Sequence, residues 1–372
     1  MHRVLVLGAG KIGSLIACLL CDSGDYEVIL SDRRTEEFDR VRHTHGLKNL
    51  RSIALDAENR SALRAFLAGN AVDAVVSALP YYCNPLVAEL AREFKVHYFD
   101  LTEDVEVTRK VRELSAGALP AFVPQCGLAP GFISIAANDL MQHFDTLDSV
   151  KMRVGALPVN PNNALKYSLT WSTDGLINEY GNFCEAIENG QLVKVLPLEG
   201  YETITVDGLV YEAFNTSGGL GTLAETYAGK LRRLNYKTLR YPGHCEKIQL
   251  LMNELKLNDD RPTLKRVLEH AIPKTTQDVV VIYVAVSGHQ HGELYEENYV
   301  RKIYPHTIAG KLWSAIQVTT AGGICAVVDL VLAQPDKFHG FVTQETFTLR
   351  EFLANRFGRY YGSAHETEKF VR

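Results

Sequence analysis

The feature that most constrains the fold of this chain is an alternation of two hydrophobic periods along its first third. Short runs rich in β-branched and aromatic residues are typical of strands, and here they cover 3–8, 26–32, 50–56, 71–80, 96–101 and 120–125. Apolar residues three or four positions apart are typical of helices, and they fill the intervals 11–24, 58–69, 84–94 and 103–117. Because strands that alternate with helices favour a parallel sheet with crossover connections, we predict an α/β domain with a doubly wound parallel sheet of six strands.

The rest of the chain has a different pattern and predicts a second domain. Helices are expected at 132–144, 173–190 and 243–255, and largely antiparallel strands at 149–157, 164–172, 191–198, 202–208 and 209–214. A glycine-bearing loop between two alternating runs predicts a long hairpin at 278–304. From residue 307 the helical period returns, so this segment can pack back on the first domain. The expected organisation is a first domain of residues 1–126 completed by 307–372, and an α+β domain of residues 127–306 with a mixed or antiparallel sheet.

Composition argues against several classes of protein. The chain has 372 residues, 46% of them hydrophobic, which is enough to bury ordinary globular cores. Its 39 Lys and Arg against 44 Asp and Glu give a net charge of −5 without a basic stretch, so no nucleic-acid partner is expected. The apolar run 313–333 contains Gln317 and Asp329 and is expected to be a core helix, so no membrane partner is expected either. Seven cysteines fit a reduced cytoplasmic interior, in which Cys18 and Cys21 serve as buried packing residues.

A glycine-rich loop joins the first predicted strand to the first predicted helix. The sequence GAGKIG begins at Gly8 and supplies Gly10 and Gly13, with Lys11 and Ile12 inside the loop. In the pattern GxGxxG the first glycine permits a tight turn, the second lets a pyrophosphate approach the backbone, and the third lets helix and strand pack closely. The N-terminus of the helix then offers N–H groups and a positive dipole to the phosphates. The loop therefore predicts the dinucleotide-binding site of a Rossmann domain.

An acidic residue follows the loop at the spacing that such sites use. Asp32 ends the second predicted strand, where a carboxylate accepts hydrogen bonds from both ribose hydroxyls of a dinucleotide. Its negative charge repels a 2′-phosphate and favours NAD over NADP. Arg33 and Arg34 come directly after it and can pair with such a phosphate, so NADP stays possible.

Further cofactor contacts are expected where the later strands of the sheet end. Asp56 follows the third strand and is a candidate contact for the adenine edge. The fourth strand ends where the nicotinamide is expected, and its candidate contacts are Ser77, Ala78, Leu79 and Pro80.

Several motifs in the rest of the chain follow GAGKIG in a fixed order. They are FDLTED, QCGLAPG, LKYSLTWS followed by a helix with asparagine and tyrosine, and TLRYPGH. In this order the chain resembles the saccharopine reductase and lysine 6-dehydrogenase family over essentially its whole length. The stretches GLAPG, IENGQ and TLRYPGHCEKI are most similar to the lysine 6-dehydrogenase branch. The resemblance implies an NAD-linked dehydrogenase that acts on a C–N bond of lysine or a lysine derivative, with protomers that form a homodimer through the second domain.

Oxidation of an amine requires a neutral nitrogen beside the carbon that gives up hydride, so some group must accept a proton. Asp100, in FDLTED, ends the fifth strand, where doubly wound sheets place their ligands, and it is a candidate catalytic and cofactor-binding residue. His244 is the second candidate, because its ordinary pKa suits proton exchange near neutrality. Each residue has a structural alternative, since either can cap the helix that follows it.

The substrate of such an enzyme is an amino acid, which carries a carboxylate. Arg240, in TLRYPGH, is the candidate clamp for it, because a guanidinium binds a carboxylate bidentately and keeps its charge at any pH. The alternative is a structural ion pair with a glutamate. Tyr167 and Trp171 lie in the predicted strand 164–172 and are candidates for an apolar wall against the substrate's methylene chain, or for core packing. Cys126 and Gly127, at the start of the GLAPG loop, are candidate substrate contacts by position.

Two histidine pairs raise the question of a metal. His43 and His45 lie in RHTHG, and His289 and His291 lie in GHQHG. Both pairs are interpreted as polar loop tips without a carboxylate or cysteine at ligand spacing, so no metal site is expected.

The leading hypothesis is oxidative ε-deamination of L-lysine with NAD. The first alternative is a saccharopine dehydrogenase that forms L-glutamate and uses NADP, or a related amino-acid or polyamine dehydrogenase. Saccharopine carries three carboxylates, whereas the motifs supply only Arg240 and Lys166 as cations, which favours the smaller substrate. A non-catalytic nucleotide-binding protein is the third hypothesis, and it predicts cofactor binding without turnover.

Overall fold

The fold comes from a computed structural model that describes residues 1–36, 38, 41, 47 and 49–362. The chain divides into two compact units, and each is described by itself. The first unit comprises Met1–Phe132, Thr307–Trp313 and Gln317–Arg372, and the second comprises Ile133–His306 and Ser314–Ile316.

A parallel sheet lies at the heart of the first unit. Its seven strands follow the order β17-β6-β5-β4-β1-β2-β3, and every neighbouring pair is parallel. The strands are β1 (His2–Leu7), β2 (Tyr26–Asp32), β3 (Leu50–Ala54), β4 (Ala74–Ser77), β5 (His97–Asp100), β6 (Ala121–Val123) and β17 (Gly340–Phe341). The six predicted strands are confirmed. β17 adds a seventh that is only two residues long, too short to leave a hydrophobic period in the sequence.

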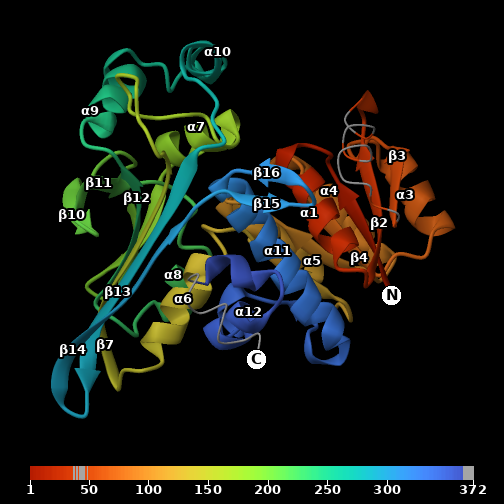
Figure 1. The fold of residues 1–372 in the computed structure, drawn as a ribbon. Helices are drawn as coiled ribbons and strands as arrows, with labels where there is room; N and C mark the ends of the chain where they lie inside the picture. The colour runs from red at the N-terminus through yellow and green to blue at the C-terminus, as the bar shows by residue number, and fades with distance from the viewer. Residues whose placement is uncertain (37, 39–40, 42–46, 48, 363–372) are drawn as a thin grey trace. The chain divides into compact units, whose positions relative to one another are not determined.

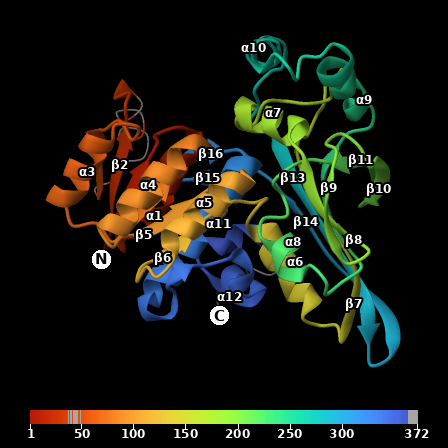
Figure 2. The ribbon, with the colours of Figure 1, turned by 180° about the vertical axis from the view of Figure 1, so that it is seen from behind.

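Helices cover both faces of this sheet. They are α1 (Lys11–Asp22), α3 (Arg60–Gly69), α4 (Asn84–Glu93), α5 (Val105–Ser115) and α11 (Ala315–Ala333). The front and back views show α1 and α11 on one face and α3, α4 and α5 on the other (Figures 1 and 2). On the second face, Leu63, Val87 and Val111 pack with Val75 and Phe122 in one buried cluster. Each buried aliphatic side chain of this kind contributes about 1.5–3 kcal/mol, so the spacing seen in the sequence is what holds the helices on the sheet.

The C-terminal segment supplies α11 and α12 (Leu349–Ala354) to the first unit. Its start differs from the helical prediction, because β15 (His306–Ile308) and β16 (Lys311–Trp313) form a two-stranded sheet before α11. Among the described residues α11 is the one helix long and apolar enough to cross a membrane, but 78% of its most apolar window is buried inside the protein. Such burial is typical of the core helix that the sequence predicts.

A mixed sheet forms the second unit. Its main path is β10-β11-β12-β7-β13-β14, and β8 pairs with β12 and with β9. The strands are β7 (Thr146–Pro158), β8 (Cys184–Glu188), β9 (Gln191–Val195), β10 (Glu202–Val206), β11 (Leu209–Asn215), β12 (Arg233–Arg240), β13 (Asp278–Gln290) and β14 (Glu293–Ile303). Most pairs are antiparallel, but β7 and β12 run parallel, so the sheet is the mixed one of the two predicted alternatives. β12 itself is absent from the predicted strands.

The helices of the second unit are α6 (Phe132–Met141), α7 (Thr173–Gly181), α8 (Leu223–Tyr227), α9 (His244–Gln249) and α10 (Arg261–Ala271). Of these, α7, α9 and α10 gather at the end of the sheet opposite the tip of the β13–β14 hairpin (Figure 1). That hairpin is confirmed, with its turn at His291 and Gly292. No group of three or more possible metal ligands occurs in the described part of the chain, where His289 and His291 lie at this tip; His43 and His45 fall outside the described residues.

Two segments of the second unit differ from the prediction. Residues 164–172, predicted as a strand, form neither strand nor helix, because the chain turns at Lys166 with a φ of 50°. The predicted helix 173–190 ends at Gly181 and gives way to the β8–β9 hairpin. Asn189 and Gly190 form its turn with φ values of 50° and 82°, and Asn-Gly is a strong signal for such a turn.

Candidate functional sites

The glycine loop between β1 and α1 has the geometry that the sequence predicts for a pyrophosphate cradle. Gly8 has a φ of 97°, which favours glycine, and a Cβ at Gly13 would lie 1.8 Å from the Gly8 carbonyl oxygen. Gly10 faces open space, because a Cβ there would meet no atom within 4 Å. The loop also packs on the end of β4, where the Ala78 carbonyl oxygen would lie 2.8 Å from a Cβ on Gly8. These close approaches and the open face at Gly10 fit a dinucleotide.

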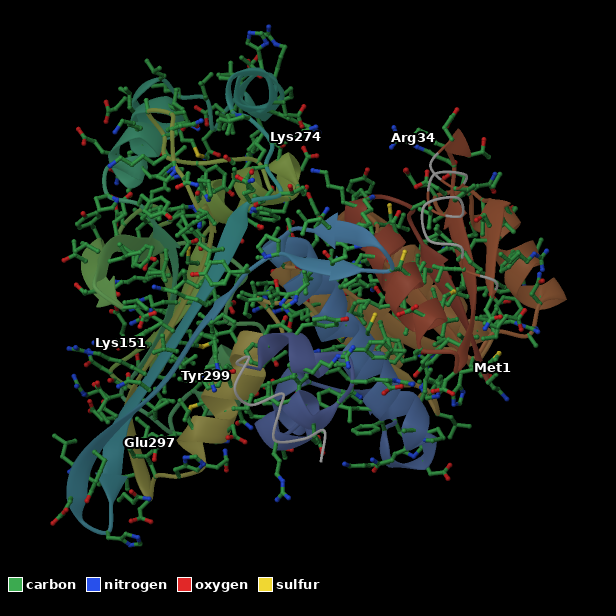
Figure 3. The ribbon with its side chains drawn as sticks, in the orientation of Figure 1. Met1, Arg34, Lys151, Lys274, Glu297 and Tyr299 are labelled. Carbon is green, nitrogen blue, oxygen red and sulfur yellow. The ribbon has the colours of Figure 1, made fainter. Side chains whose placement is uncertain are left out.

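Asp32 lies at the end of β2, beside this loop. One carboxylate oxygen accepts the Ala9 N–H at 2.8 Å and the other accepts the Arg34 N–H at 2.9 Å, so the side chain is held in place. The carboxylate is half-buried and can still accept from ribose hydroxyls. Arg33 is exposed and lies 3.8 Å from Glu58. Figure 3 labels Arg34 at the carboxyl end of the sheet and Met1 at the amino end.

The other predicted cofactor residues divide into loop and strand-end positions. Lys11 and Ile12 begin α1, and Leu79 and Pro80 follow the end of β4. Ser77 is buried and donates its hydroxyl to Asn84 at 2.7 Å, so it braces the start of α4. Asp56 is exposed and accepts the Glu58 N–H at 3.0 Å in the turn before α3.

Asp100 ends β5 and is fully buried. One carboxylate oxygen accepts the N–H groups of Thr102 and Gln125 at 2.9 and 3.0 Å, and the other accepts the Tyr98 hydroxyl at 2.6 Å. Burial raises the pKa of Asp100, while these three donors act to lower it. The alternative role as a cap of the next helix is wrong, because Asp104 caps α5 by accepting the Val107 N–H.

The segment that begins at Gln125 is held from several sides. Gln125 has a φ of 64°, and the Cys126 N–H donates to the Asp100 carbonyl at 2.9 Å. Gln344, from the C-terminal segment, donates to the Pro124 carbonyl at 2.8 Å and to the Cys126 sulfur at 3.4 Å. Burial raises the pKa of the Cys126 thiol far above its usual range, so the thiol stays protonated. Sequence reasoning missed Gln344, because it is 218 residues from Cys126 and belongs to no motif.

The Cys126–Gly131 loop is also closely packed. A Cβ on Gly131 would lie 2.1 Å from the Gly127 carbonyl oxygen, and one on Gly323 of α11 would lie 2.9 Å from the same atom. The Gly127 backbone therefore packs directly against Gly131 and Gly323, where a larger residue would collide with it. Its location after β6 places it at the same edge of the sheet as Asp100.

The second group of predicted residues lies in the second unit, around Arg240. This side chain is 3% exposed and sits over the rings of Tyr167 and Tyr180. Its Nε donates to the Tyr180 hydroxyl at 2.7 Å, and its Nη1 donates to Thr238 and to the Leu239 carbonyl at 2.6 and 2.8 Å. The expected bidentate clamp needs a free edge of the guanidinium. Only Nη2 remains for a ligand without displacing one of these bonds.

Glu179 supplies the negative charge beside Arg240. Its Oε2 lies 4.0 Å from Nη2, which is too long for a hydrogen bond. The structural ion pair weighed from the sequence is therefore present, with its two groups 4.0 Å apart. Sequence reasoning missed Glu179, because nothing in the local sequence distinguishes it from the other glutamates of the chain.

His244 completes this network as a neutral acceptor. Its Nδ1 lies 2.8 Å from the Leu165 carbonyl and its Nε2 lies 3.0 Å from the Tyr180 hydroxyl. A carbonyl can only accept, so Nδ1 carries the proton and Nε2 accepts from Tyr180. Burial and the nearby Arg240 lower the pKa of His244 to about 3. As arranged here, the ring has no free nitrogen with which to take a proton from a substrate.

His244 begins α9 but does not cap it. Glu212, buried in β11, accepts the N–H groups of Gly243 and Cys245 at 2.7 and 2.5 Å and does this instead. Tyr167 and Trp171 lie together outside any strand, with the indole N–H donating to the Tyr167 hydroxyl at 3.1 Å. Tyr167 is fully buried and Trp171 is half-buried, so the first belongs to the core of this unit.

Comparison with known proteins gives two domain matches along the chain. Residues 4–120 match the saccharopine dehydrogenase NADP-binding domain, and residues 127–359 match the saccharopine dehydrogenase C-terminal domain. Among solved structures, saccharopine dehydrogenase (L-Glu forming) of Saccharomyces cerevisiae matches with a TM-score of 0.77 and 18% identity, over 100% of this chain and 98% of that one. The homospermidine synthase of Legionella pneumophila, in complex with NAD, has a TM-score of 0.69 and 13% identity over 97% and 89% of the two chains. At these identities the solved structures show a shared fold.

Curated relatives are distant and longer. The mitochondrial alpha-aminoadipic semialdehyde synthase of Rattus norvegicus is 21% identical over 306 residues, which are 79% of this chain and 32% of the relative. Saccharopine dehydrogenase [NADP(+), L-glutamate-forming] of Schizosaccharomyces pombe is 24% identical over 204 residues, which are 52% of this chain and 44% of the relative. The matched region thus spans less than half the length of either relative. The two domain matches nevertheless cover nearly the whole chain, which belongs to the saccharopine dehydrogenase family of NAD(P)-dependent oxidoreductases that act on CH–NH donors.

Proposed function

We propose that this protein oxidises a C–N bond of lysine or a lysine derivative, and that its reaction is the oxidative ε-deamination of L-lysine with NAD. The observation that supports NAD as the cofactor is the position of the Asp32 carboxylate, which the N–H groups of Ala9 and Arg34 hold beside the glycine loop. A carboxylate at this position accepts from ribose hydroxyls and repels a 2′-phosphate. The bound nicotinamide supplies the hydride acceptor, and the chain binds, orients and shields the reactants.

The substrate half of the proposal rests on the charges around Arg240. Its Nη2 lies 4.0 Å from the Glu179 carboxylate, so a positive and a negative group lie side by side, which suits the carboxylate and the ammonium of an α-amino acid. Lys166, the other motif cation, donates to the Pro242 carbonyl at 3.0 Å. Arg240 and Glu179 together carry little net positive charge. Saccharopine has three carboxylates and needs more positive charge in its binding site than this pair provides. This balance favours lysine over saccharopine.

Saccharopine is the second candidate, because proteins named for it are among the relatives. The Schizosaccharomyces pombe relative is named a saccharopine dehydrogenase that uses NADP and forms L-glutamate, and the Saccharomyces cerevisiae structure carries a similar name. Arg33 and Arg34 lie directly after Asp32 and can meet a 2′-phosphate if the Asp32 side chain turns away.

The test is an absorbance assay of the reduced nicotinamide with four pairings: NAD or NADP, with L-lysine or saccharopine. Reduction with lysine and NAD, lost in Arg240→Ala and Glu179→Gln but kept in Lys265→Gln, would support the proposal. Lys265 is a suitable control because it pairs with the exposed Asp174 on the surface. Reduction only with saccharopine and NADP would reject lysine as the substrate. Cofactor binding without any turnover would reject the enzymatic proposal.

We also propose that two protomers pair through β14. This strand ends the second sheet, and within the described residues no strand pairs with its outer edge. Its carboxylates, Glu293, Glu296 and Glu297, lie in one half and its cations, Arg301 and Lys302, in the other (Figure 3 labels Glu297). In an antiparallel pair centred on Tyr299, Glu296 faces the partner's Lys302 and Glu297 faces the partner's Arg301. These charges also have partners within the chain, such as His143 for Glu297 and Asp207 for Lys302, and can share them.

Cross-linking tests this pairing by its register. In the proposed register Asn298 faces the partner's Val300, and all seven native cysteines are buried, so they give little background. The double variant Asn298→Cys with Val300→Cys should oxidise to a covalent dimer, while each single variant should not. A monomeric wild type by light scattering, or equal cross-linking of the single variants, would reject the pairing.

A further inference from the structure

Asp100 is a buried carboxyl group without a counter-ion among the described residues. It is fully buried, and across residues 1–36 and 49–362 of the described chain no Lys, Arg or His nitrogen forms an ion pair with it. Its oxygens accept from two backbone N–H groups and from the Tyr98 hydroxyl, which is the surrounding of an ionised carboxylate. Neutral donors compensate a buried charge only in part, so an ionised carboxylate here lowers the stability of the fold. A residue with this cost is expected to serve a purpose other than stability.

The topology indicates where this charge acts. The sheet order β3-β2-β1-β4-β5-β6 consists of two similar halves, each of three strands, and a dinucleotide lays one nucleotide over each half. Asp32 ends β2, the middle strand of the first half, where the adenosine ribose binds. Asp100 ends β5, the middle strand of the second half, so it is the counterpart of Asp32 on the nicotinamide side.

The nicotinamide ring changes its charge during the reaction. The oxidised ring is a cation and the reduced ring is neutral, so a fixed anion on that side favours the oxidised form. Asp32, on the adenosine side, meets the same ribose in both forms and has no such preference.

We propose that the Asp100 carboxylate is an electrostatic residue that makes the protein bind oxidised nicotinamide dinucleotide in preference to the reduced form. This inference rests on the proposed function only for the cofactor, and it does not depend on which amine is oxidised. Asp100 does not take the substrate's proton, because its oxygens are occupied by donors and shielded from solvent. Its negative charge stabilises the cationic, oxidised nicotinamide ring. The same field stabilises the positive charge of the iminium that forms when an amine gives up hydride.

Tyr98 tunes this charge. Its hydroxyl donates to Asp100 at 2.6 Å and acts to lower the pKa of the carboxyl, against burial, which raises it. Removal of the hydroxyl should raise the pKa of Asp100 further and neutralise the residue at a higher pH.

The first experiment measures cofactor binding without substrate. Wild type and Asp100→Asn are titrated with the oxidised and the reduced form of whichever dinucleotide the wild type binds, by calorimetry or fluorescence. We expect the oxidised form to lose about tenfold in affinity relative to the reduced form, as expected when a charge is removed at close range. Asp104→Asn is the matched control, since it removes an equal charge four residues away and keeps an oxygen that can cap α5.

A second variant keeps the test decisive if Asp100→Asn fails to fold. Affinities for both forms of the cofactor are measured between pH 9 and pH 5. As the pH is lowered, Tyr98→Phe should lose its preference for the oxidised form at a higher pH than the wild type does. Equal losses for both forms of the cofactor in Asp100→Asn, or an unchanged preference in both variants, would overturn the inference and leave Asp100 a brace of the Gln125 segment. Failure of the wild type to bind either dinucleotide would reject the proposed function instead.

Discussion

His244 illustrates how burial changes what a residue can do. From the sequence its ordinary pKa suggests a proton acceptor, but in the fold it is 1% exposed and both ring nitrogens are in hydrogen bonds. The Tyr180 hydroxyl links His244 to Arg240, and this hydrogen-bond network requires the neutral form of the histidine. The local sequence PGH contains none of these partners.

This arrangement predicts a pH dependence of stability. The folded pKa of His244 is about 3, below the unfolded value of about 6.5, so between these values the unfolded chain binds more protons. The contribution of neutral His244 to the free energy of unfolding is complete above about pH 6.5 and is lost as the pH falls. At pH 5 the loss is roughly 2 kcal/mol. In urea titrations at pH 8 and pH 5, the wild type should lose about 2 kcal/mol more than His244→Gln. Equal losses would mean that the ring is protonated in the folded state.

Asp32 gives a prediction about cofactor choice. Asp32→Ala removes the carboxylate and leaves Arg33 and Arg34 beside the site, so affinity for NAD should fall about tenfold or more and affinity for NADP should rise. Binding titrations with both dinucleotides measure the ratio. Asp56→Ala, which removes an exposed carboxylate at the end of the neighbouring strand, should change the ratio far less. A wild type that already prefers NADP would contradict the assignment of Asp32.

At the scale of elements, the first unit follows its sequence more closely than the second. Strands β1, β2, β4, β5 and β6 are largely buried, so each has a short apolar run within its own sequence, whereas β3 at the edge of the sheet is more exposed. Residues 164–172 have the alternation of a strand, but no strand of the described chain pairs with them, because Lys166 turns the chain and the Leu169 N–H donates to the Pro273 carbonyl instead. A strand needs a neighbour, and the sequence of one segment does not contain that information.

The start of α9 depends on such a distant partner. Glu212 of β11 accepts the N–H groups of Gly243 and Cys245 from inside the core. Glu212→Ala leaves both donors without this acceptor, the Cys245 N–H buried and the Gly243 N–H half-buried, and should lower the free energy of unfolding by about 2–4 kcal/mol. Urea unfolding measures the loss, and hydrogen exchange should localise it to α9. Glu246→Ala, an exposed change within the same helix, is the control and should have little effect on either measurement.

At the scale of the whole molecule, contacts between distant parts of the sequence complete the first unit. Asp329 of α11 accepts the Tyr26 hydroxyl at 2.5 Å, the Arg356 Nη2 at 2.7 Å and the Asn355 amide at 2.8 Å. This cluster joins the start of β2 to a segment that lies about three hundred residues later. No motif marks it, because its members are spread over the entire chain.

Removal of Asp329 tests how much the C-terminal segment contributes. Asp329→Ala should cost about 2–4 kcal/mol, because it leaves three donors without their acceptor. Differential scanning calorimetry should show a lower Tm than in Asp336→Asn, an exposed change nearby. If the Tm values of the two variants agree, the cluster does not hold the C-terminal segment in place.

The sequence by itself determined the parallel sheet, its crossover helices, the glycine loop and Asp32, because each depends on a hydrophobic period or a motif within about thirty residues. It also determined that the second unit is built differently. Only the tertiary structure decided that Arg240 is held by Tyr180 and faced by Glu179, that Asp100 is buried without a cation, and that Gln344 secures the segment after β6. Burial and pairing depend on groups that are far apart in the chain, and a linear pattern carries no record of which of them meet.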